Sequence, residues 1–328
     1  MGLLSSVRRR LANRRTVRAH RQASGIHPLQ HYPGYTDRDL EIFGRFIDTP
    51  TPPDPGFIAD SLGVRTRVQA LPDPLHRRGG ETIGLPVPED TFHAEAIEYI
   101  GLLKSVAAAG HRYTALELGA GWGPWLVAGA VTAKRIGIGD IRLYAVEGDP
   151  EHCAAMRQHF LDNGLDPDDH TLLNAAVGAE RGVARWPRGS KSSNNTWGMR
   201  PARQGSAADA RYLGKSGGSA KHYRDIEVLA IADLLRREER WDLVHIDIQG
   251  WEAAVCQAGL PLLTERAKYV VVGTHSRKLD GDVVQLFWQA GWVLENEKPT
   301  RFRFRANGRE LENMTEADGT QVWMNPKL

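Results

Sequence analysis

ALELGAGWGPW, at residues 115–125, carries the clearest structural signal in the sequence. An apolar run ends in Glu117, and Gly119, Gly121 and Gly123 follow at alternate positions. Glycine has no Cβ, so a turn of this kind exposes backbone N–H groups at a helix N-terminus and lets a ligand approach the main chain. We therefore expect a strand, a nucleotide-binding turn and a helix in this order.

Short β-type runs alternate with helical stretches after an amphipathic helix expected over residues 93–109. These runs occupy residues 114–120, 141–148, 171–178, 242–250 and 269–276. Strands that alternate with helices are typical of parallel pairing, so we predict an α/β fold with a doubly wound, mostly parallel sheet of Rossmann-like type. Further β candidates at 292–297, 301–305 and 320–324 predict an antiparallel C-terminal hairpin.

The domain organisation follows from breaks in composition. Residues 1–90 are expected to form an irregular, Pro-rich extension that opens with a basic segment at 1–21, and residues 91–328 the main domain. A polar stretch at about 188–224 is inserted between the third and fourth core strands. Its length is unusual for a connection, so it is either a disordered loop or a loop that covers a substrate.

Charge and hydropathy exclude several classes of protein. The formal net charge is +2, with 42 basic and 40 acidic residues, so no overall field favours nucleic acid as a partner. No apolar stretch is long enough for a transmembrane helix, although segment 1–21 leaves peripheral contact with an anionic membrane open. Cys153 and Cys256 lack metal or redox spacing. We expect a cytoplasmic protein with reduced thiols.

The type of nucleotide is the next question, because nicotinamide enzymes use GxGxxG and here Pro124 stands at the third glycine position. The spacing ExGxGxG of the turn resembles instead the first motif of class I methyltransferases, which implies S-adenosyl-L-methionine as cofactor. Glu147 ends the second β run, where an acid can accept bonds from ribose hydroxyls in either class. Asn174 and the backbone around Ala176 are candidates to line the adenine, although Asn174 could equally be a turn residue.

Four segments together resemble the FkbM methyltransferase family over roughly residues 112–300. They are LELGAGWG, LYAVEGDP, NAAVG and DLVHIDIQGWEAAVCQAG. In that family the fourth strand typically ends in Ile-Asp-Val-Glu-Gly-x-Glu, and the next strand in Glu-x-His. Here Gln249 and Gly273 replace the two acids, whereas Asp247, Glu252 and His275 are kept. The loss of two carboxylates disfavours a metal-dependent mechanism, so no metal is expected.

The resemblance implies O-methylation of a hydroxyl on a sugar, glycan or natural-product acceptor. Methyl transfer to an alcohol needs near-attack geometry and a base for the departing proton. Asp247 and His275 are the catalytic candidates, because both follow adjacent central strands. Asp247 could instead cap the following helix or orient the cofactor, and His275 could be structural. Two alternatives stay open: an NAD(P)-dependent oxidoreductase, and a cofactor-binding protein that has lost its chemistry.

Overall fold

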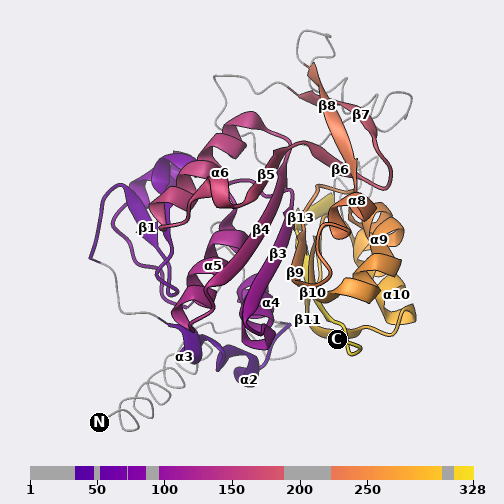
Figure 1. Ribbon diagram of the computed structural model, residues 1–328, viewed down its shortest axis with the longest axis horizontal. Coiled ribbons are helices and arrows are strands. Elements are labelled where there is room, and N and C mark those ends of the chain that lie inside the picture. The colour runs from indigo at the N-terminus through magenta and orange to yellow at the C-terminus, as the bar shows by residue number, and fades with distance from the viewer. Residues whose placement is uncertain (1–33, 48–51, 72, 86–95, 188–222, 305–313) are drawn as a thin grey trace.

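The computed structural model describes six stretches of the chain, drawn in colour in Figure 1. They are residues 34–47, 52–71, 73–85, 96–187, 223–304 and 314–328. The basic segment 1–21 lies outside the described residues, as does the insertion at 188–224 apart from its last two positions.

A seven-stranded sheet forms the centre of the molecule, in the order β11-β14-β10-β9-β3-β4-β5. The pairs β3–β4, β3–β9, β9–β10 and β4–β5 are parallel, whereas β14 runs antiparallel to both β10 and β11. The predicted doubly wound, mostly parallel sheet is thus confirmed. Its strands are β3 (Arg112–Leu118), β4 (Asp140–Glu147), β5 (Thr171–Asn174), β9 (Trp241–Ile246), β10 (Ala267–Thr274), β11 (Val293–Lys298) and β14 (Gly319–Met324).

The antiparallel hairpin at the C-terminus is also present, but its second strand is not the one nearest in sequence. β11 pairs with β14, and the RFRFR segment between them contributes β12 (Arg301–Phe302), which pairs with β13 (Thr315–Ala317) in a separate small ladder. The chain therefore leaves the sheet after β11, forms this second ladder and returns as β14.

Helices cover both faces of the sheet, as Figure 1 shows. Successive side chains of a strand point to opposite faces, so Ala115 lies in the core under one helical layer and Leu116 in the core under the other. Burial of apolar strands on both faces is what a parallel sheet requires. One layer holds α4 (Ala96–Ala108), α5 (Pro124–Arg135) and α6 (Pro150–Asp162), followed by η4 (Pro167–Asp169); the other holds α8 (Ile231–Leu235), α9 (Glu252–Arg266) and α10 (Arg277–Gln289).

Where the structure describes it, the N-terminal extension contains only short elements, as its Pro-rich sequence predicts. Leu40, Phe43 and Phe46 are buried in the same core as α4 and α5, so the extension adds to that core. Among the described residues, no helix is long and apolar enough to cross a membrane. The elements are α2 (Asp37–Leu40), α3 (Phe43–Phe46), β1 (Phe57–Ala59), β2 (Arg65–Arg67), η2 (Val68–Ala70) and η3 (Asp73–Arg78).

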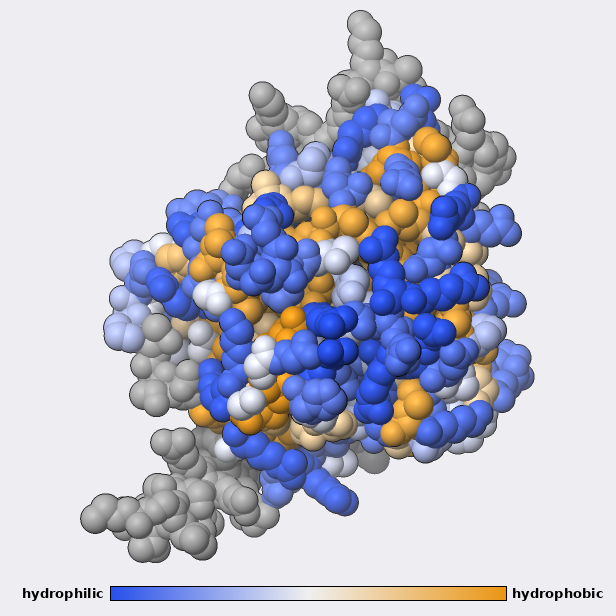
Figure 2. Space-filling model, in the orientation of Figure 1, coloured by the Kyte–Doolittle hydropathy of each residue, from blue (hydrophilic) through white to orange (hydrophobic). Residues whose placement is uncertain are grey.

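The expected continuous strand over 171–178 is wrong in one respect, because it breaks at Ala175. The Ala175 amide donates to the main-chain oxygen of Glu147 at 3.1 Å, and the chain then leaves the central sheet. Residues beyond the break form a second sheet, in the order β6 (Ala176–Gly178), β8 (Tyr223–Ala230) and β7 (Gly182–Pro187). The face of the molecule seen in Figure 1 is mostly hydrophilic, with separate apolar patches, as Figure 2 shows in the same orientation.

Candidate active site

The glycine turn joins β3 to α5 at the carboxyl edge of the sheet. Gly119, Gly121 and Gly123 have φ values of +77°, +55° and +71°, a region that side-chain-bearing residues rarely adopt. Gly123 is the N-cap of α5, and Pro124 occupies its first turn, where the missing N–H costs nothing. The predicted strand, turn and helix are therefore confirmed, and Gly119 is exposed at the rim.

Glu117 supports this turn from below. Its side chain is buried, and its carboxylate accepts a hydrogen bond from the Leu126 amide in the first turn of α5 at 3.1 Å. Burial raises the pKa of Glu117 to about 8, because its effect outweighs the lowering of that pKa by the neighbouring charge of His245. The structure thus places this predicted cofactor-binding residue under the turn, where it caps a helix that no N-cap side chain satisfies.

Glu147, at the end of β4, reaches the same turn. One carboxylate oxygen accepts the Gly121 amide at 2.8 Å and the other the Asp149 amide at 2.6 Å. A carboxylate has about four acceptor sites, so these two bonds leave capacity for hydroxyl groups. The structure therefore brings Glu147 and the glycine turn together, as the sequence predicts.

Asn174 and Ala176 lie in different environments. Asn174 is exposed, and its amide donates to the main-chain oxygens of Glu147 at 2.9 Å and Gly148 at 3.0 Å, which fixes the chain next to β4. Ala176 is buried with Trp186 in the second sheet. Its side chain therefore belongs to a separate apolar cluster.

An acid–histidine cluster of Asp247, Glu252 and His275 forms where β9 and β10 end. His275 lies between two carboxylates: its Nε2 is 3.2 Å from Asp247 Oδ1, and its Nδ1 is 2.9 Å from Glu252 Oε1. Glu252 is fully buried and also accepts the amides of Ile248 and Gly250, each at 3.0 Å. The two catalytic candidates are thus in direct contact, with Glu252 as a third member.

The charges in this cluster favour an ion pair. Burial alone would lower the pKa of His275, but the carboxylates of Asp247 and Glu252 outweigh it and raise that pKa well above 6.5. Burial likewise raises the pKa of Asp247, but the opposing charge and hydrogen bond of His275 lower it overall. These directions favour a protonated His275 and an ionised Asp247, so Asp247 rather than His275 is the candidate proton acceptor.

Both departures from the family pattern lie against Asp247. Gln249 has a φ of +54°, and its amide donates to Asp247 Oδ1 at 3.0 Å, a bond that a carboxylate could not supply. A Cβ at position 273 would lie 3.2 Å from Asp247 Cγ, which is tighter than ordinary contact. Gly273 therefore leaves room for Asp247, and Gln249 holds it.

The same three side chains have a geometry that could also hold a metal ion, because one potential ligand atom from each lies within 4.8 Å of the others. The ion pairs of His275 with Asp247 and Glu252 account equally well for these short distances. The expectation that the site holds no metal stays a prediction.

Asp318 is a residue of this region that sequence reasoning missed. Its Oδ2 lies 4.0 Å from His275 Nε2, because Thr274 of β10 pairs with Gly319 of β14 in antiparallel register. Only the correct partner for the last strand would have revealed this neighbour.

Comparisons with known proteins agree with the geometry. The model of the "Methyltransferase FkbM domain" matches residues 127–294, and a Jannaschia sp. (strain CCS1) protein named "Putative methyltransferase" is 31% identical over 245 residues, 75% of this chain and 85% of that one. The chain belongs to the FkbM methyltransferase family. Membership of the FkbM family favours a methyltransferase over the oxidoreductase alternative.

Solved structures with similar folds include a methyltransferase FkbM from Methylobacillus flagellatus KT, with 11% identity and a TM-score of 0.37 over 64% of this chain and 44% of that chain. Another is a precorrin-6y C5,15-methyltransferase from Geobacter metallireducens GS-15, with 10% identity and a TM-score of 0.38 over 72% of this chain and 90% of that chain.

Proposed function

We propose that this FkbM family member is an S-adenosylmethionine-dependent O-methyltransferase that acts on a hydroxyl of a sugar, glycan or natural-product acceptor. The observation that carries the proposal is the junction of the glycine turn and the acid–histidine cluster. The Asp247 amide donates to the main-chain oxygen of Leu118 at 2.9 Å, immediately before Gly119. A candidate base therefore stands beside a candidate cofactor turn at the carboxyl edge of the sheet, where open α/β sheets bind ligands.

The residues of the turn fit an adenosyl cofactor. The exposed main chain at Gly119 permits close approach, and the remaining acceptor sites of Glu147 suit ribose hydroxyls. When bound, S-adenosylmethionine supplies an electrophilic methyl group. Glu117 and Gly123 would keep α5 and the turn in place, since Gly123 is the N-cap of that helix and the Glu117 carboxyl group accepts the Leu126 amide in its first turn.

Asp247 is the proposed proton acceptor. As an acceptor oxygen bonds to carbon, its hydroxyl becomes strongly acidic, so even a carboxylate with a lowered pKa can take the proton. His275, held between Asp247 and Glu252, would fix the direction of the Asp247 carboxylate. Positioning of this kind accounts for much of the catalysis in a displacement that forms no covalent enzyme intermediate.

The test uses the purified full chain with methyl-labelled S-adenosylmethionine and a panel of hydroxylated sugars and natural products. Label should appear as an acid-stable ether on at least one acceptor, and Asp247→Asn should lower that rate by roughly a hundredfold. S-adenosylhomocysteine should bind the variant as it binds the wild type. Label transfer to a nitrogen or carbon atom, or full activity of Asp247→Asn, would refute the proposal.

A further inference from the structure

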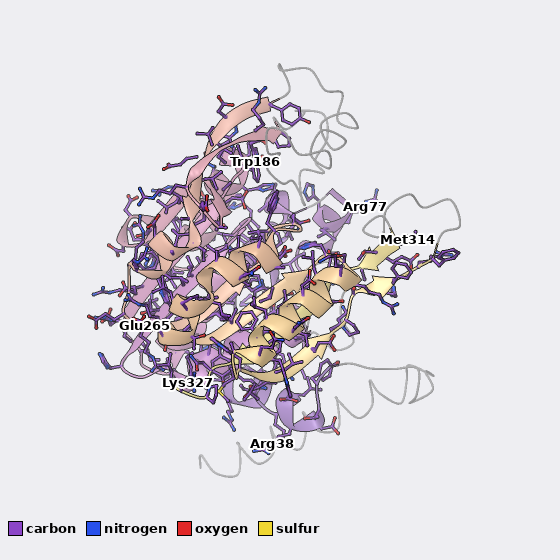
Figure 3. All side chains as sticks on the ribbon, turned by 90° about the vertical axis from the view of Figure 1, so that its right-hand side faces the viewer. Arg38, Arg77, Trp186, Glu265, Met314 and Lys327 are labelled. Carbon is purple, nitrogen blue, oxygen red and sulfur yellow. The ribbon has the colours of Figure 1, made fainter. Side chains whose placement is uncertain are left out.

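A short arm leaves the molecule close to the acid–histidine cluster. We define the arm as residues 301–304 and 314–317, in which β12 pairs with β13 and the Arg303 amide donates to the main-chain oxygen of Met314 at 2.8 Å. Figure 3 shows Met314 on the opposite side of the molecule from Glu265 at the end of α9. The arm thus belongs to the edge of the sheet at which the strands β9 and β10 end.

Buried hydrogen bonds fix the root of the arm beside His275. The buried carboxylate of Asp280 accepts bonds from the Thr274 hydroxyl and, at 2.9 Å, from the Thr300 amide. Thr274 directly precedes His275, and Thr300 directly precedes the arm. Asp318, at the other end of the arm, lies 4.0 Å from His275. The root of the arm therefore lies beside the candidate catalytic residues.

The arm carries more positive than negative charge. Arg301 and Arg303 share one carboxylate, that of Glu316, at 3.6 Å and 2.9 Å, and the two arginine side chains are 72% and 70% exposed. Arg277, two residues after His275, adds a third guanidinium, which lies 5.2 Å above the ring of Phe302. The excess charge is available to an anion, which arginine recognises through paired N–H donors.

Aromatic rings accompany these charges. Phe302 is half-buried beneath Arg277, and Phe304 is 75% exposed. An exposed aromatic ring offers an apolar face to a flat or ring-shaped ligand. Arginine and phenylalanine therefore alternate along the arm, with cationic groups for charge and ring faces for contact.

We propose that the arm binds the acceptor and that the acceptor is an anionic sugar, with a carboxylate or phosphate held by Arg301 and Arg303 and a ring face against Phe302 or Phe304. This inference rests on the proposed function, because it names the substrate class of the same site. It distinguishes an acidic acceptor from the neutral sugars and natural products that the family resemblance leaves open.

The test measures binding of three probes to the full chain in the presence of S-adenosylhomocysteine. The probes are a short oligogalacturonate, glucose 6-phosphate and a neutral cello-oligosaccharide. Saturation-transfer NMR or calorimetry measures the binding of each. At least one acidic probe should bind at least tenfold more tightly than the neutral one, and this preference should weaken with added salt. The two acidic probes distinguish a carboxylate from a phosphate.

Arm variants supply the second readout. Arg301→Ala combined with Arg303→Ala should weaken acidic-probe binding by roughly tenfold. Arg142→Ala is the control: it removes a half-exposed arginine of β4 that pairs with Glu238, and it should leave acidic-probe binding unchanged. Phe302→Ala with Phe304→Ala should weaken binding several-fold, whereas Trp288→Ala, at an exposed aromatic ring on α10, should not.

Four outcomes would overturn the inference: equal binding of acidic and neutral probes, binding of none, an arm variant with unchanged affinity, or a stronger preference for a single-stranded oligonucleotide of matched charge. Loss of S-adenosylhomocysteine binding by the wild type would instead contradict the proposed function. The arm variants should retain S-adenosylhomocysteine affinity, which confirms that they fold.

Discussion

A side chain at position 119 would collide with the main chain of Asp247, since a Cβ built on Gly119 would lie 1.8 Å from the Asp247 oxygen. The glycine turn and the candidate base are therefore packed backbone to backbone. Any shift of one moves the other, so the two parts of the proposed site depend on the same contact.

Gly119→Ala should therefore damage both stability and ligand binding. The substitution combines a left-handed φ with a clash against immobile backbone, and we expect a loss of ~2–4 kcal/mol in the free energy of unfolding. Gly137→Ala is the matched control, because Gly137 also has a positive φ but nothing within 4 Å of its Cβ position. It should cost about 1 kcal/mol and leave S-adenosylhomocysteine affinity unchanged. Urea unfolding of both variants checks this, and equal losses would contradict the account.

The pairing of His275 predicts a stability that depends on pH. Its pKa is raised in the folded state, so its ion pairs stabilise the fold fully below 6.5 and lose that effect as the pH rises through the folded-state pKa. Asp247, whose pKa is lowered, stays charged over this window. His275→Asn should cost roughly 2 kcal/mol near pH 6 and less in alkali. A difference that stays constant from pH 6 into alkali would show that His275 is not held as a cation.

Glu117 predicts a loss of stability in the same direction, beginning at a lower pH. Its pKa is raised from 4.5 to about 8, so the folded state keeps a proton that the unfolded chain releases, and stability falls as the pH rises between these values. Glu117→Gln carries no such proton and keeps an acceptor for the Leu126 amide. The variant should match the wild type near pH 4.5 and exceed it by ~2–4 kcal/mol near pH 8. Glu180→Gln, at an exposed position, is the control.

Gln249→Glu tests the departure from the family pattern. The new carboxylate would remove the donor to Asp247 and repel it, which raises the pKa of Asp247. We expect the acidic limb of the pH–rate profile to move to higher pH, with kcat near neutrality roughly tenfold lower. Gln249→Met removes the hydrogen bond that helps to lower the pKa of Asp247 but adds no charge, so it should move that limb in the same direction by a smaller amount. An unchanged pH–rate profile for Gln249→Glu would show that Gln249 takes no part in catalysis.

The sequence predicts the central sheet well because its strands are long, apolar and followed by turns. β3, β4, β9 and β10 lie within a few residues of the expected runs. The break at Ala175 could not be predicted, because the residues after Asn174 are small and apolar and the Ala175 amide donates to the main-chain oxygen of Glu147, far away in sequence. The choice of β14 as the partner of β11 could not be predicted for a similar reason, since it depends on how the arm leaves the sheet.

The site was partly predictable. Asp247 and His275 follow neighbouring strands, and the structure joins them. Glu252 resembled the family pattern, but its contact with His275 depends on how the chain turns at Gln249 and Gly250, which both have positive φ. Glu117 was expected among the cofactor-binding residues, which stays a prediction; its buried carboxyl group accepts the Leu126 amide of the otherwise uncapped helix α5, a contact that the sequence does not reveal.

Calorimetric titration with S-adenosylhomocysteine and, separately, with NAD(H) tests the central claim most directly, on the wild type and on Glu147→Gln. The account predicts a dissociation constant on the order of micromolar for S-adenosylhomocysteine, roughly tenfold weaker in Glu147→Gln, and no response to NAD(H). Binding of NAD(H) alone, or S-adenosylhomocysteine affinity that is unaffected by Glu147→Gln, would contradict it.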